Sequence, residues 1–131
     1  MAQIQVSIVT PETTTFDAAV DSVIVPLIDG AKGILAGHAP MIGRLGPGEL
    51  KVVTGSSSER FYVDGGFVQI ADDNVSVLTG NSIPAAEIDL AKAKADLEAA
   101  KAQTADKPEL MELKQKAVAQ ATAQIRMVEN V

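Results

Sequence analysis

Glycine and alanine divide this sequence into two regions, and the division limits the folds open to the chain. All ten glycines lie between Gly30 and Gly80, whereas residues 85–131 contain 13 alanines and no glycine. Glycine supplies the positive φ angles that tight turns need, and alanine has the highest helix propensity. The sequence therefore predicts a β region over residues 1–84 and an α region over residues 85–131.

Short stretches typical of strands recur through the first region. "IQVSIV" at residues 4–9 alternates apolar and polar side chains, as a half-buried strand does. Turn-forming residues separate these stretches, and they include Asp29-Gly30, Gly46-Pro47-Gly48, Gly65-Gly66 and Asp72-Asp73-Asn74. The predicted strands are residues 4–9, 19–28, 49–54, 60–65, 67–71 and 75–79. Many short strands indicate a sandwich or barrel. The connections are too short for helical crossovers, so the sheet is expected to be antiparallel.

Two apolar stripes at helical spacing predict a two-helix antiparallel hairpin in the second region. The stripes are Leu90, Ala93, Leu97, Ala100, Thr104 and Leu110, Leu113, Ala117, Ala121, Ile125, Val128. Between them, Asp106-Lys107-Pro108-Glu109 is a capping-box pattern with Asp106 as the predicted N-cap, and Asp89 can cap the first helix. Alanine buries little apolar area, so the sequence fits either a mobile tail or a plain alanine-rich hairpin.

The overall composition excludes several classes of protein. The chain has 11 basic and 17 acidic residues, a formal net charge of -6 and no basic cluster, which argues against nucleic-acid binding. It has no cysteine, which excludes disulfides and thiolate chemistry. No apolar run reaches the ~20 residues of a membrane span, and the first ten residues lead us to expect no targeting signal.

His38 is the one imidazole in the chain and the first candidate for chemistry. No G-x-S-x-G elbow accompanies it, and no histidine or cysteine lies near it at metal-ligand spacing. The glycines form neither a G-x-G-x-x-G nor a P-loop pattern, and Asp72-Asp73-Asn74 lacks the other ligands of a calcium loop. We therefore expect no catalytic residue, metal or cofactor. A small β-sandwich hydrolase or a free-standing binding module that uses the His38 region is the alternative.

Three motifs and the helical tail resemble the epsilon-subunit family of F-type ATP synthases, called delta in mitochondria. "IVTPETTTFDAAVDSVIVP" is similar to the opening strands of that family, and "GILAGHAPMIGRLGPGELKV" to its most recognisable block. "FYVDGGFVQIADDNVSVL" and "IDLAKAKADLEAAK" follow in the family order. The resemblance covers the whole chain and implies a β-sandwich followed by a helical hairpin.

The resemblance also implies a function that is not enzymatic. The sandwich, residues 1–84, would bind the gamma subunit and the c ring of a proton-translocating synthase in its central rotor stalk. The hairpin, residues 85–131, would reach the alpha/beta catalytic head and restrain ATP hydrolysis. The complex would hold the chain peripherally on the cytoplasmic face of the bacterial inner membrane.

The resemblance further implies three sets of site residues. The expected gamma interface is His38, Ala39, Pro40, Met41 and Ile42, where a rigid bend would present the last two side chains to gamma. The expected c-ring-facing loop is Asp29, Gly30, Ala31 and Lys32. A weak nucleotide site would comprise Ile88, Asp89, Lys92 and Ala93.

Lysine replaces arginine in the nucleotide motif I/L-D-x-x-R-A of that family. Lys92 is a point charge without the planar fork of arginine. Gln120 and Gln124 stand near positions where ATP-binding members carry arginines. We therefore expect no tight ATP binding, and we expect Asp89 to act as a helix cap.

Overall fold

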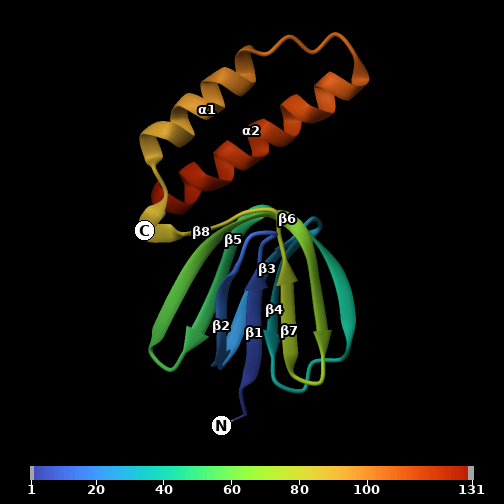
Figure 1. Ribbon diagram of the computed structural model, residues 1–131, viewed down its shortest axis with the longest axis vertical. Helices are drawn as coiled ribbons and strands as arrows, with labels where there is room; N and C mark the ends of the chain where they lie inside the picture. Colours follow the sequence, from blue (N-terminus) through green and yellow to red (C-terminus); the bar gives the residue numbers. More distant parts are fainter. Residues whose placement is uncertain (1, 130–131) are drawn as a thin grey trace.

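The computed structural model describes residues 2–129 and shows a β-sandwich with two helices folded over one end of it (Figure 1). The strands are β1 (Ile4–Val9), β2 (Thr14–Val20), β3 (Ser22–Leu27), β4 (Gly30–Leu35), β5 (Met41–Thr54), β6 (Ser57–Ala71), β7 (Asn74–Leu78) and β8 (Ser82–Pro84). The helices are η1 (Ala85–Glu87), α1 (Leu90–Ala102) and α2 (Pro108–Glu129). The predicted sandwich followed by a two-helix hairpin is confirmed. Neither α-helix within residues 2–129 has the length and apolar character of a bilayer span.

Two long strands, β5 and β6, build both layers of the sandwich. They pair antiparallel from Met41↔Ile70 to Thr54↔Ser57, and both arch over the top of the sandwich in Figure 1. The strand order β2-β1-β7-β6-β5-β3-β4 places three strands beside one arm of this hairpin and two beside the other. β8 pairs with the first arm of β6. The bend thus folds one hydrogen-bonded sheet into two facing layers.

The core fills the space between these layers with the inward residues of each strand. Phe16 of β2 and Phe61 of β6 meet edge to face, with ring centroids 5.5 Å apart, which is a favourable aromatic geometry. Alternation along each strand assigns one side chain inward and the next outward. The buried apolar core comprises Ile4, Val6, Ile8, Val20, Val23, Val25, Ile34, Leu45, Leu50, Val52, Phe61, Val63, Val68, Ile70, Val75 and Val77.

The prediction of one strand over residues 19–28 was wrong, because the chain turns at Asp21. Its N–H donates to the Val53 carbonyl at 2.8 Å, and its carboxylate accepts the Gly55 N–H at 2.6 Å. These bonds hold Asp21 between β2 and β3, which run in opposite directions. The apolar residues of 19–28 therefore belong to two strands.

The two glycine clusters predicted as turns are bends within continuous strands. Gly65 and Gly66 have φ angles of 85° and 116°, but β6 continues through them. Gly48 of β5 lacks a positive φ, and its missing side chain instead admits Pro26, whose Cβ would lie 2.9 Å from a Cβ at Gly48. By contrast, Asp72 and Asp73 do form the predicted turn, a two-residue hairpin loop with positive φ at both residues.

One strand pair is parallel, which the sequence did not predict. β1 pairs with β7 from Gln5↔Asn74 to Val9↔Leu78. Short connections determine the relative direction only of strands that follow one another, whereas many strands intervene between β1 and β7. The remaining strand pairs among residues 2–129 are antiparallel.

The helical hairpin forms as predicted, with one capping error. The Asp89 carboxylate accepts the Lys92 N–H at 3.0 Å and caps α1. Asp106 is not the N-cap of α2, because the first helical bond runs from the Met111 N–H to the Lys107 carbonyl. Lys107 occupies the cap position, and Pro108 then takes the first helical position, where its missing N–H costs nothing.

The seam between the helices contains small residues, and the predicted stripe of α2 is only partly buried. Ala93, Ala100 and Ala121 are buried, whereas Leu113 is 62% exposed. The first turns of α2 lie away from the sandwich (Figure 1). This part of the stripe therefore has no layer to pack against.

Gly66→Ala is expected to destabilise the sandwich severely. An added Cβ would collide with the Leu78 carbonyl oxygen and lie 3.0 Å from Thr79 Cα, at a φ that non-glycine residues avoid. We expect a loss of at least ~3 kcal/mol in the free energy of unfolding, measured by urea titration. Gly33→Ala is the control, because a Cβ there meets nothing within 4 Å. Equal stability of the two variants would contradict this account of the bend.

Candidate partner-binding surfaces

The segment around His38 forms a bend that joins β4 to β5. The Gly37 N–H donates to Asp73 Oδ1 at 2.7 Å, and the His38 N–H donates to the Leu35 carbonyl at 3.2 Å. His38 Nδ1 lies 2.7 Å from the Ala39 carbonyl. Because a carbonyl only accepts, Nδ1 carries the proton in this arrangement. The imidazole thus helps to order the bend.

Beyond this bend, Met41 and Ile42 point in opposite directions. Met41 packs against the core, whereas Ile42 is 73% exposed. Of the residues predicted to face gamma, Ile42 therefore offers the large apolar surface. Whether any of them contacts a partner stays a prediction.

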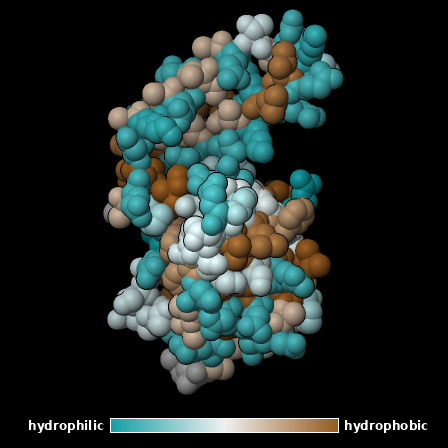
Figure 2. All heavy atoms as spheres, in the orientation of Figure 1, coloured by the Kyte–Doolittle hydropathy of each residue, from teal (hydrophilic) through white to brown (hydrophobic). Residues whose placement is uncertain are grey.

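Ile42 belongs to an exposed apolar patch that the sequence analysis missed. Phe67 and Leu78 pair directly across β6 and β7 and are 52% and 50% exposed. Ile42 lies diagonally across from Phe67, because Arg44 pairs with Phe67 and Ile42 with Gln69. Apolar side chains show on this flank of the sandwich in Figure 2. We call Ile42, Phe67 and Leu78 the flank patch.

A sequence signal for the flank patch existed in the strand alternation. Val68 and Ile70 point inward in β6, so Phe67 and Gln69 must point outward. A large aromatic residue in the outward phase of a strand is informative, since apolar groups gathered on a surface mark interaction sites. Alternation within one strand does not show that Phe67 and Leu78 are neighbours, because their pairing depends on the register of β6 and β7.

The predicted c-ring-facing loop is shorter than expected. Leu27 pairs with Gly30 and Pro26 with Ala31, so the turn consists of Ile28 and Asp29. Gly30, Ala31 and Lys32 belong to β4 rather than to a loop, whereas their contact with the c ring stays a prediction. Ile28 is 63% exposed at the tip. β4 has six residues, so the tip lies about 20 Å from the His38 bend at ~3.3 Å per residue.

The four residues predicted as a weak nucleotide site lie at the start of α1. The Asp89 carboxylate is engaged in the cap, and Ala93 is buried in the helix seam. A cavity of about 300 Å³ opens further along between the helices, lined by acidic, amide and alanine side chains. Its amides include Gln120 and Gln124, and its acid is Asp96. Phosphate groups prefer cationic partners, which this lining lacks. Among residues 2–129 no cluster of metal-ligating side chains is present.

The tail docks on the outer face of β5 and β6 through the end of α2. Met127 is 3% exposed there, and Tyr62 of β6 is 1% exposed. Burial raises the pKa of Tyr62 strongly, and the nearby Asp64 carboxylate raises it further, while a hydrogen bond from Gln124 of α2 opposes both. The Tyr62 hydroxyl donates to Asp64 Oδ1 at 2.9 Å. The docked helix thus covers a phenol that stays protonated.

Comparison with known proteins identifies the family of this chain. Residues 3–85 match the family model "ATP synthase, Delta/Epsilon chain, beta-sandwich domain". The ATP synthase epsilon chain of Rhodopirellula baltica is 45% identical over 119 residues, which cover 91% of this chain and 93% of that protein. The sodium ion specific epsilon chain of Propionigenium modestum is 31% identical over 132 residues, covering 99% and 96%.

Solved structures of ATP synthases contain the same fold. A chain in the mitochondrial ATP synthase of Euglena gracilis, solved as OSCP/F1/c-ring, matches with a TM-score of 0.83 and 25% identity, covering 94% of this chain and 79% of that chain. A chain in the central stalk/c-ring structure from Tetrahymena thermophila matches with a TM-score of 0.72 and 18% identity, covering 97% of each, which shows the fold alone. The protein is therefore a member of the ATP synthase delta/epsilon chain family.

Proposed function

We propose that this protein is a non-catalytic subunit of the central stalk of a proton-translocating F-type ATP synthase. Residues 1–84 would join the gamma subunit to the c ring, and residues 85–131 would form a tail that restrains ATP hydrolysis at the alpha/beta head. The subunit would lie peripherally on the cytoplasmic face of the inner membrane. Because one relative is named sodium ion specific, proton pumping by vesicles in sodium-free medium tests the coupling ion.

The flank patch is the observation that carries this proposal. Ile42, Phe67 and Leu78 form a contiguous apolar surface on an otherwise strongly acidic chain. Large exposed apolar side chains that adjoin one another support a protein interface. The patch extends the His38–Ile42 segment along the same flank, so we assign both to the gamma interface. His38, with Nδ1 bonded to the Ala39 carbonyl, would order this surface and perform no chemistry.

The β3–β4 tip is the region that we assign to the c ring. Ile28 and Asp29 protrude there, and Lys32 follows within β4. The tip and the His38 bend lie at opposite ends of β4, whereas the tip adjoins the flank patch, because the Ile28 N–H donates to the carbonyl of Arg44, which pairs with Phe67. The two assigned interfaces are therefore neighbours on one stiff sandwich, which supports a coupling role because both partners would bind to the same body.

Phe67→Asp is expected to weaken binding of the gamma subunit by more than about tenfold, as loss of an interface anchor does. The substitution lies on the surface, so the free energy of unfolding should change by less than about 0.5 kcal/mol. Binding is measured by titrating the purified chain with gamma. Leu113→Asp is the matched control, because Leu113 is 62% exposed and lies near the start of α2, away from both the flank patch and the His38 bend. Equal binding by both variants would contradict the assigned interface.

Deletion of residues 88–131 is expected to raise ATP hydrolysis by the assembled enzyme and to leave assembly intact. The expectation follows from a tail that contacts the sandwich chiefly through α2 and has a seam of small residues. Hydrolysis is measured on the isolated complex, and subunit composition is the control. Unchanged hydrolysis would contradict the tail's role as a brake but would not affect the coupling role.

A further inference from the structure

The docked tail is attached to the sandwich at one end of α2. α1 packs on α2 rather than on the sheets, and α2 contacts β5 and β6. Met127, near the end of α2, is buried, whereas Met111 and Leu113, near its start, are 49% and 62% exposed. Because the tail is held at this one end of α2, it would leave the sandwich when the contacts at that end break. The contacts around Met127 therefore decide whether the tail is docked.

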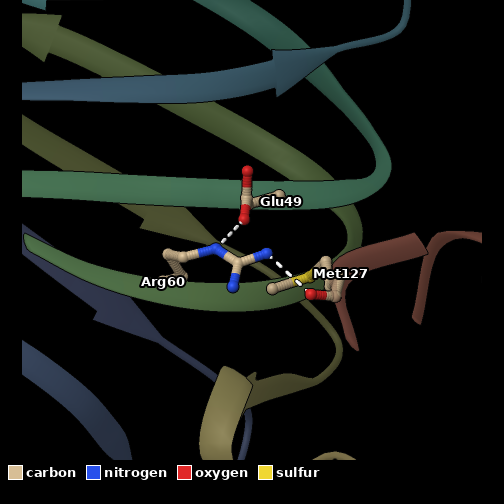
Figure 3. Close-up of polar contacts among 3 residues, drawn as sticks. All are labelled: Glu49, Arg60 and Met127. Atoms are coloured by element: carbon tan, nitrogen blue, oxygen red, sulfur yellow. Dashed lines mark hydrogen bonds and ion pairs between the residues drawn. The ribbon is translucent and has the colours of Figure 1, made fainter. Parts of the chain in front are cut away.

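Arg60 makes a polar contact at this end, in addition to the hydrogen bond from Gln124 to Tyr62. Its Nη2 donates to the Met127 carbonyl at 2.7 Å, and its Nε donates to the Glu49 carboxylate of β5 (Figure 3). Met127 lies in the last turn of α2, where carbonyls lack an intrahelical partner and the helix dipole is negative. A guanidinium donates a hydrogen bond to such a carbonyl and also places a positive charge at the negative end of the dipole. The Arg60 side chain is only 23% exposed.

We propose that Arg60 is a latch that holds the tail in its docked state, with Glu49 as the residue that orients it. The consequence for hydrolysis rests on the proposed role of the tail, whereas the latch itself does not. When α2 leaves, Arg60 keeps its bond to Glu49 within the sandwich, so the guanidinium stays positioned for redocking. The two bonds need the fixed fork of arginine, because a lysine presents a single ammonium.

The latch predicts a graded effect on tail release. Arg60→Met keeps the apolar stem and removes both bonds, and it should raise the released-to-docked ratio about tenfold, which is about 1.4 kcal/mol. Arg60→Lys and Glu49→Gln should each give a smaller increase. Lys51→Met is the matched control, because Lys51 pairs with Arg60 across β5 and β6. Both side chains line a cavity of about 540 Å³, to which Met127 of α2 also contributes.

Release is measured on the purified full-length chain by the distance between two labels. The chain has no cysteine, so Ser56→Cys and Thr104→Cys provide unique sites at exposed positions of the sandwich and of the helix connection. Resonance energy transfer or spin-label distances then give the docked and released populations. Thermal unfolding of each variant shows that the sandwich is intact, and Glu49→Gln carries the test if Arg60→Met does not fold.

A tenfold shift in Arg60→Met with no shift in Lys51→Met would support the latch. Equal shifts in the two variants would overturn it, because the effect would then be one of net charge. No shift in Arg60→Met would overturn it as well. If the Arg60→Met tail is released while hydrolysis by the assembled enzyme does not change, the latch is supported and the proposed brake fails.

Discussion

The shared bend of β5 and β6 is the constraint on which the rest of the structure depends. Straight strands of 14 and 15 residues would extend for about 45–50 Å at ~3.3 Å per residue and leave one face of the sheet in water. The bend instead turns each strand back over itself, so the inward residues of both arms share one core. Gly66 permits this because the Leu78 carbonyl occupies the space where a side chain would start. The bend also determines the outer surfaces, since it places the flank patch on one layer and Arg60 on the other.

The sequence predicted the classes of the elements better than their connections. The change from glycine to alanine separates the two kinds of structure, and the alternation in "IQVSIV" predicts β1 with its observed bounds. Glycine, however, favours turns and in-strand bends for the same reason, so Gly65-Gly66 could not reveal which was present. The parallel pairing of β1 with β7 is a long-range contact that no local pattern records.

For the candidate surfaces too, the sequence predicted what a local motif indicates but not what long-range contacts bring together. The motif around His38 indicated a surface region, and the structure adds Phe67 and Leu78, which come from distant strands and meet only through register. The sequence did not predict that Met127 docks on the sandwich, because its partner Arg60 lies 67 residues earlier in the chain. Asp106 failed as a cap because Lys107-Pro108 shifts the helix start by one residue, a difference that propensity rules do not resolve.

The parallel pairing of β1 with β7 also governs the order in which the protein can fold during synthesis. β1 leaves the ribosome first, but its parallel neighbour β7 begins only at Asn74. Until then the nascent sandwich exposes the apolar faces of β1 and β2, and such non-local closure is slow compared with helix formation. The alanine-rich tail follows the strands in the sequence and docks on β5 and β6. A newly made chain thus passes through a stage in which its apolar strands need protection from aggregation.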